Sequence, residues 1–128
     1  MTPHDIRTYL FDIAQACVRL RQFTAGKTFA DYAADPLLRS AVERQFEIIG
    51  EALNRALHLD PSLAARISDA GRIIAFRNRL IHAYASIADE VVWGVLESNL
   101  PTLQREVDAQ LREAEKHWQP GTEGGTPA

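Results

Sequence analysis

The chain has 128 residues, of which 46% are hydrophobic and 24% are charged, a composition typical of a single globular domain. Its 14 Lys and Arg residues against 17 Asp and Glu residues give a formal net charge of −3. This acidic balance argues against a general nucleic-acid coat protein, because nonspecific binding of that kind depends on many cations that neutralise phosphates. Cys17 is the only cysteine, which excludes an intrachain disulfide and a cysteine-rich zinc site.

The sequence contains no recognisable targeting or membrane segment. Residues 1–5 lack the basic and then apolar pattern of a secretory signal. No apolar run approaches the ~20 residues that a membrane span needs. We therefore expect a soluble, cytoplasmic protein without a membrane partner.

Helical spacing of apolar residues predicts a first helix over residues 3–23. Thr2 is its expected N-cap, Pro3 lies in its first turn, and Gly26 follows its end. The pair Asp35-Pro36 predicts the start of a second helix, whose apolar stripe extends to Ala56.

Gly50 lies in the middle of this second helix. Glycine there costs about 1 kcal/mol relative to alanine, which suggests that another helix approaches closely at this position.

The second half of the chain is also helical in pattern. Asp60-Pro61 predicts a short helix, and a longer one begins after Ser68 or Asp69 and extends to about Tyr84. Its expected inward residues are Ile73, Ile74, Leu80 and Ile81.

A further helix is predicted from Asp89, and Pro101 either kinks it or opens a new one. The helical period continues to Trp118, and the proline- and glycine-rich residues 119–128 are expected to be a disordered tail. No segment has the period of a strand. The sequence thus predicts an all-α domain over residues 1–118, an antiparallel bundle of four to five helices.

Residues 77–84 place an arginine, an amide, a histidine and a phenol within little more than two helical turns. Arginine matches phosphate oxygens bidentately, and histidine as a residue type can take and give a proton near neutral pH. Arg77 and His82 are therefore candidate catalytic residues, with Asn78 orienting His82 or binding a phosphate oxygen. A candidate cationic patch for local RNA contact consists of Arg66, Arg72, Arg77 and Arg79.

On an ideal helix Asn78 and His82 share a face, whereas Arg77 lies about 140° away from His82. Three arrangements would bring them together: a frayed helix end, an arginine that reaches around the helix, or two copies of the helix that meet at a two-fold axis. The dimeric cleft would contain two histidines, one to remove a proton from a ribose 2′-hydroxyl and one to protonate the leaving oxygen. Without such a cleft, His82 is a helix C-terminal histidine stabilised by the helix dipole, and the arginines are solvated surface charges.

Three glutamates recur every four residues on the second helix. Glu43, Glu47 and Glu51 could suggest metal ligands, but an ion pair of Glu51 with Arg55 on a solvated face is simpler. Glu47 and Glu51 could also border the cleft.

Arg77, four residues, His82, one residue and Tyr84 resemble the signature of the HepT-like ribonuclease toxins of the HEPN superfamily. The similarity includes residues 47–52 upstream and residues 91–93 and 100–103 downstream. Residues 66–71 depart from the family, which has a proline and a tryptophan at this entry to the signature helix.

The resemblance implies a homodimeric, metal-independent endoribonuclease without a cofactor, with a composite site at the dimer interface. Arg77 and His82 would be catalytic, and Asn78 and Arg79 would support the site or bind RNA. The family also implies the toxin of a type VII-like toxin–antitoxin pair, whose partner is a minimal nucleotidyltransferase antitoxin of the MntA type. That partner would silence the toxin by AMPylation of Tyr84, because added phosphates oppose RNA by charge and bulk.

Two other functions stay open at this point. One is a catalytically idle HEPN module that binds nucleotide or RNA, or that only scaffolds a nucleotidyltransferase. The other is a purely structural bundle.

Overall fold

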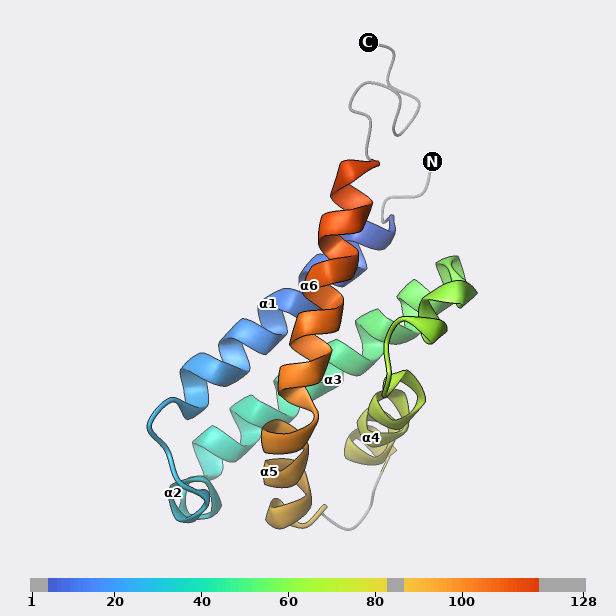
Figure 1. Ribbon diagram of the computed structural model, residues 1–128. Helices are drawn as coiled ribbons and strands as arrows, with labels where there is room; N and C mark the ends of the chain where they lie inside the picture. The colour runs from blue at the N-terminus through green and yellow to red at the C-terminus, as the bar shows by residue number, and fades with distance from the viewer. Residues whose placement is uncertain (1–4, 83–86, 118–128) are drawn as a thin grey trace.

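The computed structural model of this protein describes residues 5–82 and 87–117, all of whose regular secondary structure is helical (Figure 1). The all-α prediction is therefore confirmed. The described residues form six α-helices rather than four to five, together with one short 3-10 helix, η1. The elements are α1 (Ile6–Thr24), α2 (Phe29–Ala34), α3 (Pro36–Leu59), η1 (Pro61–Ala65), α4 (Ala70–His82), α5 (Asp89–Ser98) and α6 (Leu100–Lys116). The predicted tail over residues 119–128 lies outside the described residues.

Helix α1 begins later than its sequence pattern predicted. Asp5, rather than Thr2, is the N-cap, and its carboxylate accepts hydrogen bonds from the backbone N–H groups of Arg7 and Thr8 at 2.9 and 3.3 Å. A carboxylate at this position satisfies donors that have no partner within the helix. After the helix ends, Gly26 has a φ of 73°, a left-handed conformation that glycine adopts without steric cost.

Helix α2 was not predicted, because six residues are too few to show a clear apolar period. Thr28 caps it in a capping box: its hydroxyl accepts from the Asp31 N–H, and the Asp31 carboxylate accepts from the Thr28 N–H. The helix is held by the ring of buried Tyr32, which lies 5.3 Å from the ring of Trp93 on α5. A contact across 61 positions of sequence, rather than local propensity, therefore stabilises α2.

The other predicted helix starts are confirmed. Asp35 caps α3, with Pro36 in the first turn, and Asp60 caps η1, with Pro61 in the same role. Pro101 lies in the first turn of α6, so it opens a new helix and does not kink α5.

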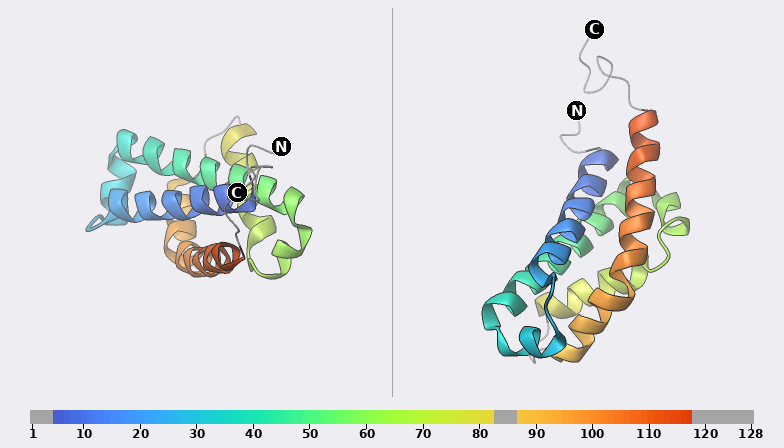
Figure 2. Two further views of the ribbon diagram at one scale, coloured as in Figure 1. Left: turned by 90° about the horizontal axis from the view of Figure 1, so that it is seen from above. Right: turned by 60° about the vertical axis from the view of Figure 1, so that its left-hand side comes forward.

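Helices α1 and α3 pack against each other at the centre of the bundle, and the other helices pack around them. α1 lies between α3 and α6, as the view from above shows (Figure 2), and α4 packs against α3 after the turn at η1. α5 packs against α2 and α6. The core residues with no exposed surface come from α1, α2, α3 and α6: Ile13, Ala16, Cys17, Leu20, Tyr32, Val42, Ile49, Leu53, Ala56 and Val107.

Cys17 belongs to this core. Burial, followed by the negative charge of Asp108, raises the pKa of its thiol to about 12. The thiol is therefore protonated at neutral pH, which excludes Cys17 as a ready nucleophile. Within residues 5–82 and 87–117, no helix combines the length and apolar composition needed to cross a membrane.

Candidate active site on helix α4

The loop before α4 is fastened to the C-terminal helices. The Ser68 N–H donates to the Glu106 carboxylate of α6 at 3.0 Å, and the Asn99 amide donates to the Asp69 carboxylate at 2.9 Å. Arg66 donates to the Gln110 side chain at 2.8 Å. Side chains of residues 99–110 thus hold this loop, and with it the start of α4.

The inward face of α4 differs in part from the predicted one. Ile73 is buried as expected, but the other large buried side chain is Phe76, whose ring meets that of Phe46 on α3 at 5.3 Å and 84°. Ile74 and Leu80 are only partly buried. Ile81 was expected to be inward but is 44% exposed; it lies in the last turn of α4 and lines a cleft between α1, α3 and α4.

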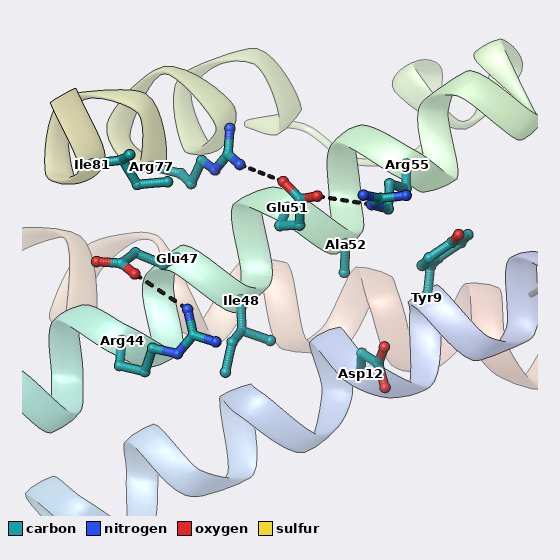
Figure 3. Close-up of a pocket in the computed structure, with 10 residues that line it drawn as sticks. All are labelled: Tyr9, Asp12, Arg44, Glu47, Ile48, Glu51, Ala52, Arg55, Arg77 and Ile81. Carbon is teal, nitrogen blue, oxygen red and sulfur yellow. Dashed lines mark hydrogen bonds and ion pairs between the residues drawn. The ribbon is translucent and has the colours of Figure 1, made fainter.

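Arg77 points from α4 toward Glu51 on α3 (Figure 3). One guanidinium nitrogen, Nη2, forms an ion pair with the Glu51 carboxylate, and the other, Nη1, donates to Asn78 Oδ1 at 2.8 Å. The side chain is 21% exposed and lines a cleft of about 530 Å³ between α1, α3 and α4. Arg77, which is predicted to be catalytic, is thus held by the carboxylate of Glu51. The sequence pattern predicted only an ion pair of Glu51 with Arg55.

Gly50 allows this arrangement. A Cβ atom built on Gly50 would lie 2.2 Å from Arg77 Cβ and 2.6 Å from Arg77 Cγ. The predicted close approach of another helix is therefore confirmed, and what approaches is the stem of Arg77 on α4. Arg77 Cβ is bonded to the α4 backbone, so no change of rotamer could make room for a larger residue at position 50.

We expect Gly50→Ala to destabilise the protein. Overpacking costs about 1–3 kcal/mol and outweighs the gain of about 1 kcal/mol from replacing a helical glycine. The midpoint of urea unfolding should therefore fall. Gly94→Ala is the matched control, because a Cβ at this helical position of α5 would meet no described atom within 4 Å, and its midpoint should rise. If the midpoint of urea unfolding rose equally in both variants, α4 would be able to move away from α3 without a loss of stability.

His82 is the last residue of α4, and its side chain is exposed. It has no hydrogen bond or ion pair with any residue in the part of the chain that the structure describes. Asn78, one turn earlier, is exposed as well, and its described partner is Arg77 rather than His82. Within one chain, therefore, Arg77 turns into the cleft and His82 faces outward, as their angular separation on the helix predicted. Tyr84 lies outside the described residues.

The predicted cationic patch divides into two parts. Arg66 pairs with Asp60 at 3.0 Å, and Arg77 pairs with Glu51. Arg72 and Arg79 have no ion pair within residues 5–82 and 87–117, and both line a groove of about 280 Å³ between α4 and α5. Its apolar floor is formed by Ile73, Phe76, Val91 and Val95.

Two of the three glutamates of α3, Glu47 and Glu51, are engaged in ion pairs. Glu51 pairs with Arg55 at 2.8 Å, as the sequence predicted, and Glu47 pairs with Arg44 at 3.3 Å (Figure 3). The hydrogen bond from Arg55, and then the positive charge of Arg77, lowers the pKa of Glu51. Both glutamates line the cleft between α1, α3 and α4 of one chain. Their place beside a cleft formed by two copies of α4 stays a prediction. The adjacency of Glu51 to Gly50 is the only sequence signal that could have suggested its contact with Arg77.

The chain matches the Ribonuclease HepT-like family over residues 13–109, which includes all of α3, α4 and α5. Because this match covers most of the chain, the protein belongs to the HepT-like ribonuclease family. The resemblance drawn from residues 77–84 is thus confirmed at the level of the family.

Several relatives from archaea and bacteria match most of the chain. "Probable ribonuclease HepT" of Thermococcus cleftensis is 33% identical over 102 residues, which cover 77% of this chain and 88% of the relative. A protein of Caldanaerobacter subterraneus, provisionally named as the RNase TTE0752, is 32% identical over 108 residues, 83% of this chain and 94% of the relative. Another of Methanocaldococcus jannaschii, provisionally named as the RNase MJ0127, is 27% identical over 115 residues, 90% of this chain and 94% of the relative. No solved structure matches the chain at a significant level.

Proposed function

We propose that this protein is an endoribonuclease that acts as the toxin of a type VII-like toxin–antitoxin pair in the cytoplasm, where its RNA substrate is found. The observation that carries the proposal is the signature of Arg77, His82 and Tyr84 on and just after α4, in a chain of the HepT-like ribonuclease family. The exposure of His82 and Asn78 on one face of α4 supports it, since both are accessible to a polymeric substrate.

The proposed chemistry needs two proton transfers and one charged group. One His82 imidazole takes the proton from a ribose 2′-hydroxyl, whose oxygen then attacks the adjacent phosphorus. The bond from phosphorus to the 5′-oxygen of the next nucleotide breaks, and a second imidazole protonates that oxygen. Arg77 stabilises the negative charge that develops on the phosphorane. The products are a 2′,3′-cyclic phosphate and a 5′-hydroxyl, and no step requires a metal ion.

The second imidazole comes from a second copy of the chain. The exposed strip of α4 carries Gly71 and Ala75 in line with Asn78 and His82, and small residues let two helix backbones approach closely. Two copies that pack along this strip across a two-fold axis bring two His82 side chains together. Each Arg77 lies at the edge of the same strip, because its guanidinium already contacts Asn78.

The exposed arginines of α4 provide the RNA contacts beside the cleavage site. Arg72 and Arg79 are seven residues apart on one side of the helix, at the rim of the groove between α4 and α5. Within the part of the chain that the structure describes, neither guanidinium group has an ion pair, so both can bind phosphates, and the apolar floor of the groove accommodates a base.

The proposed activity is tested directly with purified protein and a labelled single-stranded RNA in the presence of EDTA. Cleavage should yield 2′,3′-cyclic phosphate ends, and the same sequence made with 2′-deoxyribose should stay intact. An RNA that is cut only after addition of a divalent metal would contradict the metal-independent mechanism. An RNA that binds without being cut would favour the second candidate function, a catalytically idle HEPN module. This candidate draws support from the ion pair that neutralises Arg77 and from its separation from His82 within one chain.

Tyr84 is the proposed acceptor of AMP from a minimal nucleotidyltransferase antitoxin. With the partner, ATP and magnesium, the intact protein should gain mass in AMP units and lose ribonuclease activity. Tyr84→Phe keeps the ring and removes the acceptor oxygen, so this variant should gain no mass and stay active in the presence of the partner. AMP on another residue, with the Tyr84→Phe protein still silenced, would show that the switch lies elsewhere.

A further inference from the structure

A continuous line of contacts leads from α3 to the exposed strip of α4. Arg55 Nε donates to Glu51 Oε1 at 2.8 Å, and Arg77 Nη2 pairs with the other carboxylate oxygen, Glu51 Oε2. Arg77 Nη1 in turn donates to Asn78 Oδ1 at 2.8 Å. Both oxygens of Glu51 are thus occupied by different arginines (Figure 3), and two nitrogens of Arg77 are directed to different partners.

We propose that Glu51 is a positioning residue for RNA cleavage: it fixes the Arg77 guanidinium and, through this group, the amide of Asn78, which lies on the face of α4 that carries His82. This inference rests on the proposed function and assigns to it a residue outside the signature. Glu51 does not touch the substrate, and it acts through Arg77.

Arg77 has few other constraints on its charged end. Its stem is pinned against Gly50, and its Nε is buried with no acceptor within residues 5–82 and 87–117. Among the same residues, Glu51 is the one carboxylate within ion-pair distance of Arg77. Removing the Glu51 charge would therefore leave a partly buried guanidinium without compensation, free to turn toward water.

The contact between Arg77 and Asn78 also fixes a group on the exposed face of α4 that carries His82. Because Arg77 occupies Asn78 Oδ1, the amide plane of Asn78 is fixed, and its NH₂ group is left to donate elsewhere. Asn78 and His82 are four residues apart and share the exposed face of α4. An N–H donor held there is suited to a phosphate oxygen next to the imidazole, and a fixed donor costs less entropy in the transition state than a mobile one.

The same ion pair could instead mask Arg77, so that RNA would have to displace Glu51. We favour positioning because Arg77 contacts Asn78, which shares an exposed face of α4 with His82, while it is bound to Glu51, so no release is needed. A guanidinium has five N–H donors, and the two contacts leave others for phosphate. The two roles predict opposite effects of the same substitution: loss of the Glu51 charge lowers activity if Glu51 positions Arg77, and raises activity if Glu51 masks it.

Glu51→Gln tests the inference, with Glu47→Gln as the matched control. Glu47 lies one turn earlier on α3, lines the same cleft and pairs with an arginine, but within residues 5–82 and 87–117 it forms no hydrogen bond or ion pair with Arg77. With a labelled single-stranded RNA, Glu51→Gln should lower kcat by about tenfold to a hundredfold, the effect of a misplacement near 1 Å, with KM nearly unchanged. Glu47→Gln should keep the wild-type kcat. A kcat for Glu51→Gln that equals or exceeds the wild-type value would overturn the inference.

A double-mutant cycle separates positioning from a merely structural role. If Glu51 acts through Arg77, then Glu51→Gln should add less than about twofold to the loss already caused by Arg77→Lys. Full additivity of the two losses would show that Glu51 affects the fold and not the guanidinium. Glu51→Asp provides a second variant that keeps the charge but shortens the reach, and it should also lower kcat.

A readout without RNA keeps this inference distinct from the proposed function. The side-chain amide signals of Asn78 in ¹⁵N NMR, identified by their loss in Asn78→Asp, should shift in Glu51→Gln and stay in place in Glu47→Gln. If they shift in a protein that cuts no RNA, the contacts hold and the ribonuclease proposal fails. If RNA is cut but the signals do not move, the positioning role fails and the ribonuclease proposal stands.

Discussion

His82→Ala is expected to lower RNA cleavage by about 10²–10⁴-fold, because general acid–base catalysis contributes a factor of this size. His82 is exposed at the end of α4 and has no described partner, so the substitution should leave helicity and the thermal midpoint nearly unchanged. Cleavage rates under single-turnover conditions, together with circular dichroism, measure both effects.

His117→Ala is the matched control for this experiment. His117 is also an exposed histidine at a helix end, the C-cap of α6, so it shares any interaction with a helix dipole. It should cut RNA at the wild-type rate. If His82→Ala keeps its ribonuclease activity, His82 takes no part in the reaction. Its position would then be explained by the interaction of a histidine with the dipole at the C-terminal end of a helix.

A mixture of one part wild-type chains and nine parts His82→Ala chains, at the same total chain concentration as the pure wild type, is expected to keep about 1% of the wild-type activity after subunit exchange. A composite site that needs both histidines works only in dimers of two wild-type chains, whose share is the square of the wild-type fraction. A site contained in one chain would leave about 10%. The structure motivates this test, because Arg77 and His82 of one chain point in different directions.

Dilution with His117→Ala chains controls for dimer exchange and should not reduce the activity. Two affinity tags, one on each kind of chain, show that hybrids have formed. Residual activity near 10% with verified hybrids would contradict the shared site, and sedimentation of monomers alone at micromolar concentration would contradict the dimer itself.

Gly50→Ala tests how α3 and α4 pack, and Tyr84→Phe tests regulation by a partner. Glu51→Gln tests how Arg77 is held. Only His82→Ala and the dilution experiment decide whether the face of α4 that carries His82 is the site of chemistry.

The sequence by itself determined the helical class and most helix starts. Asp35-Pro36 and Asp60-Pro61 are local signals, because a capping carboxylate and a first-turn proline act on backbone groups two or three residues away. The signature of Arg77, His82 and Tyr84 was equally local, and it was sufficient to identify the family. The angular separation of Arg77 and His82 also followed from the helical period alone.

Where contacts cross between helices, local patterns gave incomplete or wrong answers. The cap of α1 was placed three residues early, at Thr2 instead of Asp5, because both residue types can cap a helix and only the folded backbone distinguishes them. Helix α2 was missed, since the ring of Trp93 holds Tyr32 from another part of the chain. Ile81 was placed inside because it is apolar, although it lies in the last turn of α4 and is 44% exposed.

The direction of Arg77 was decided by the tertiary structure alone. Its partner Glu51 lies 26 residues earlier in sequence, and the choice between cleft and solvent depends on how closely Gly50 lets α4 approach α3. Helical periodicity places a residue on a face, but a long side chain at the edge of that face can turn either way. Packing against the neighbouring helix and the position of a compensating charge make the choice, and neither is encoded within the few residues that a sequence motif spans.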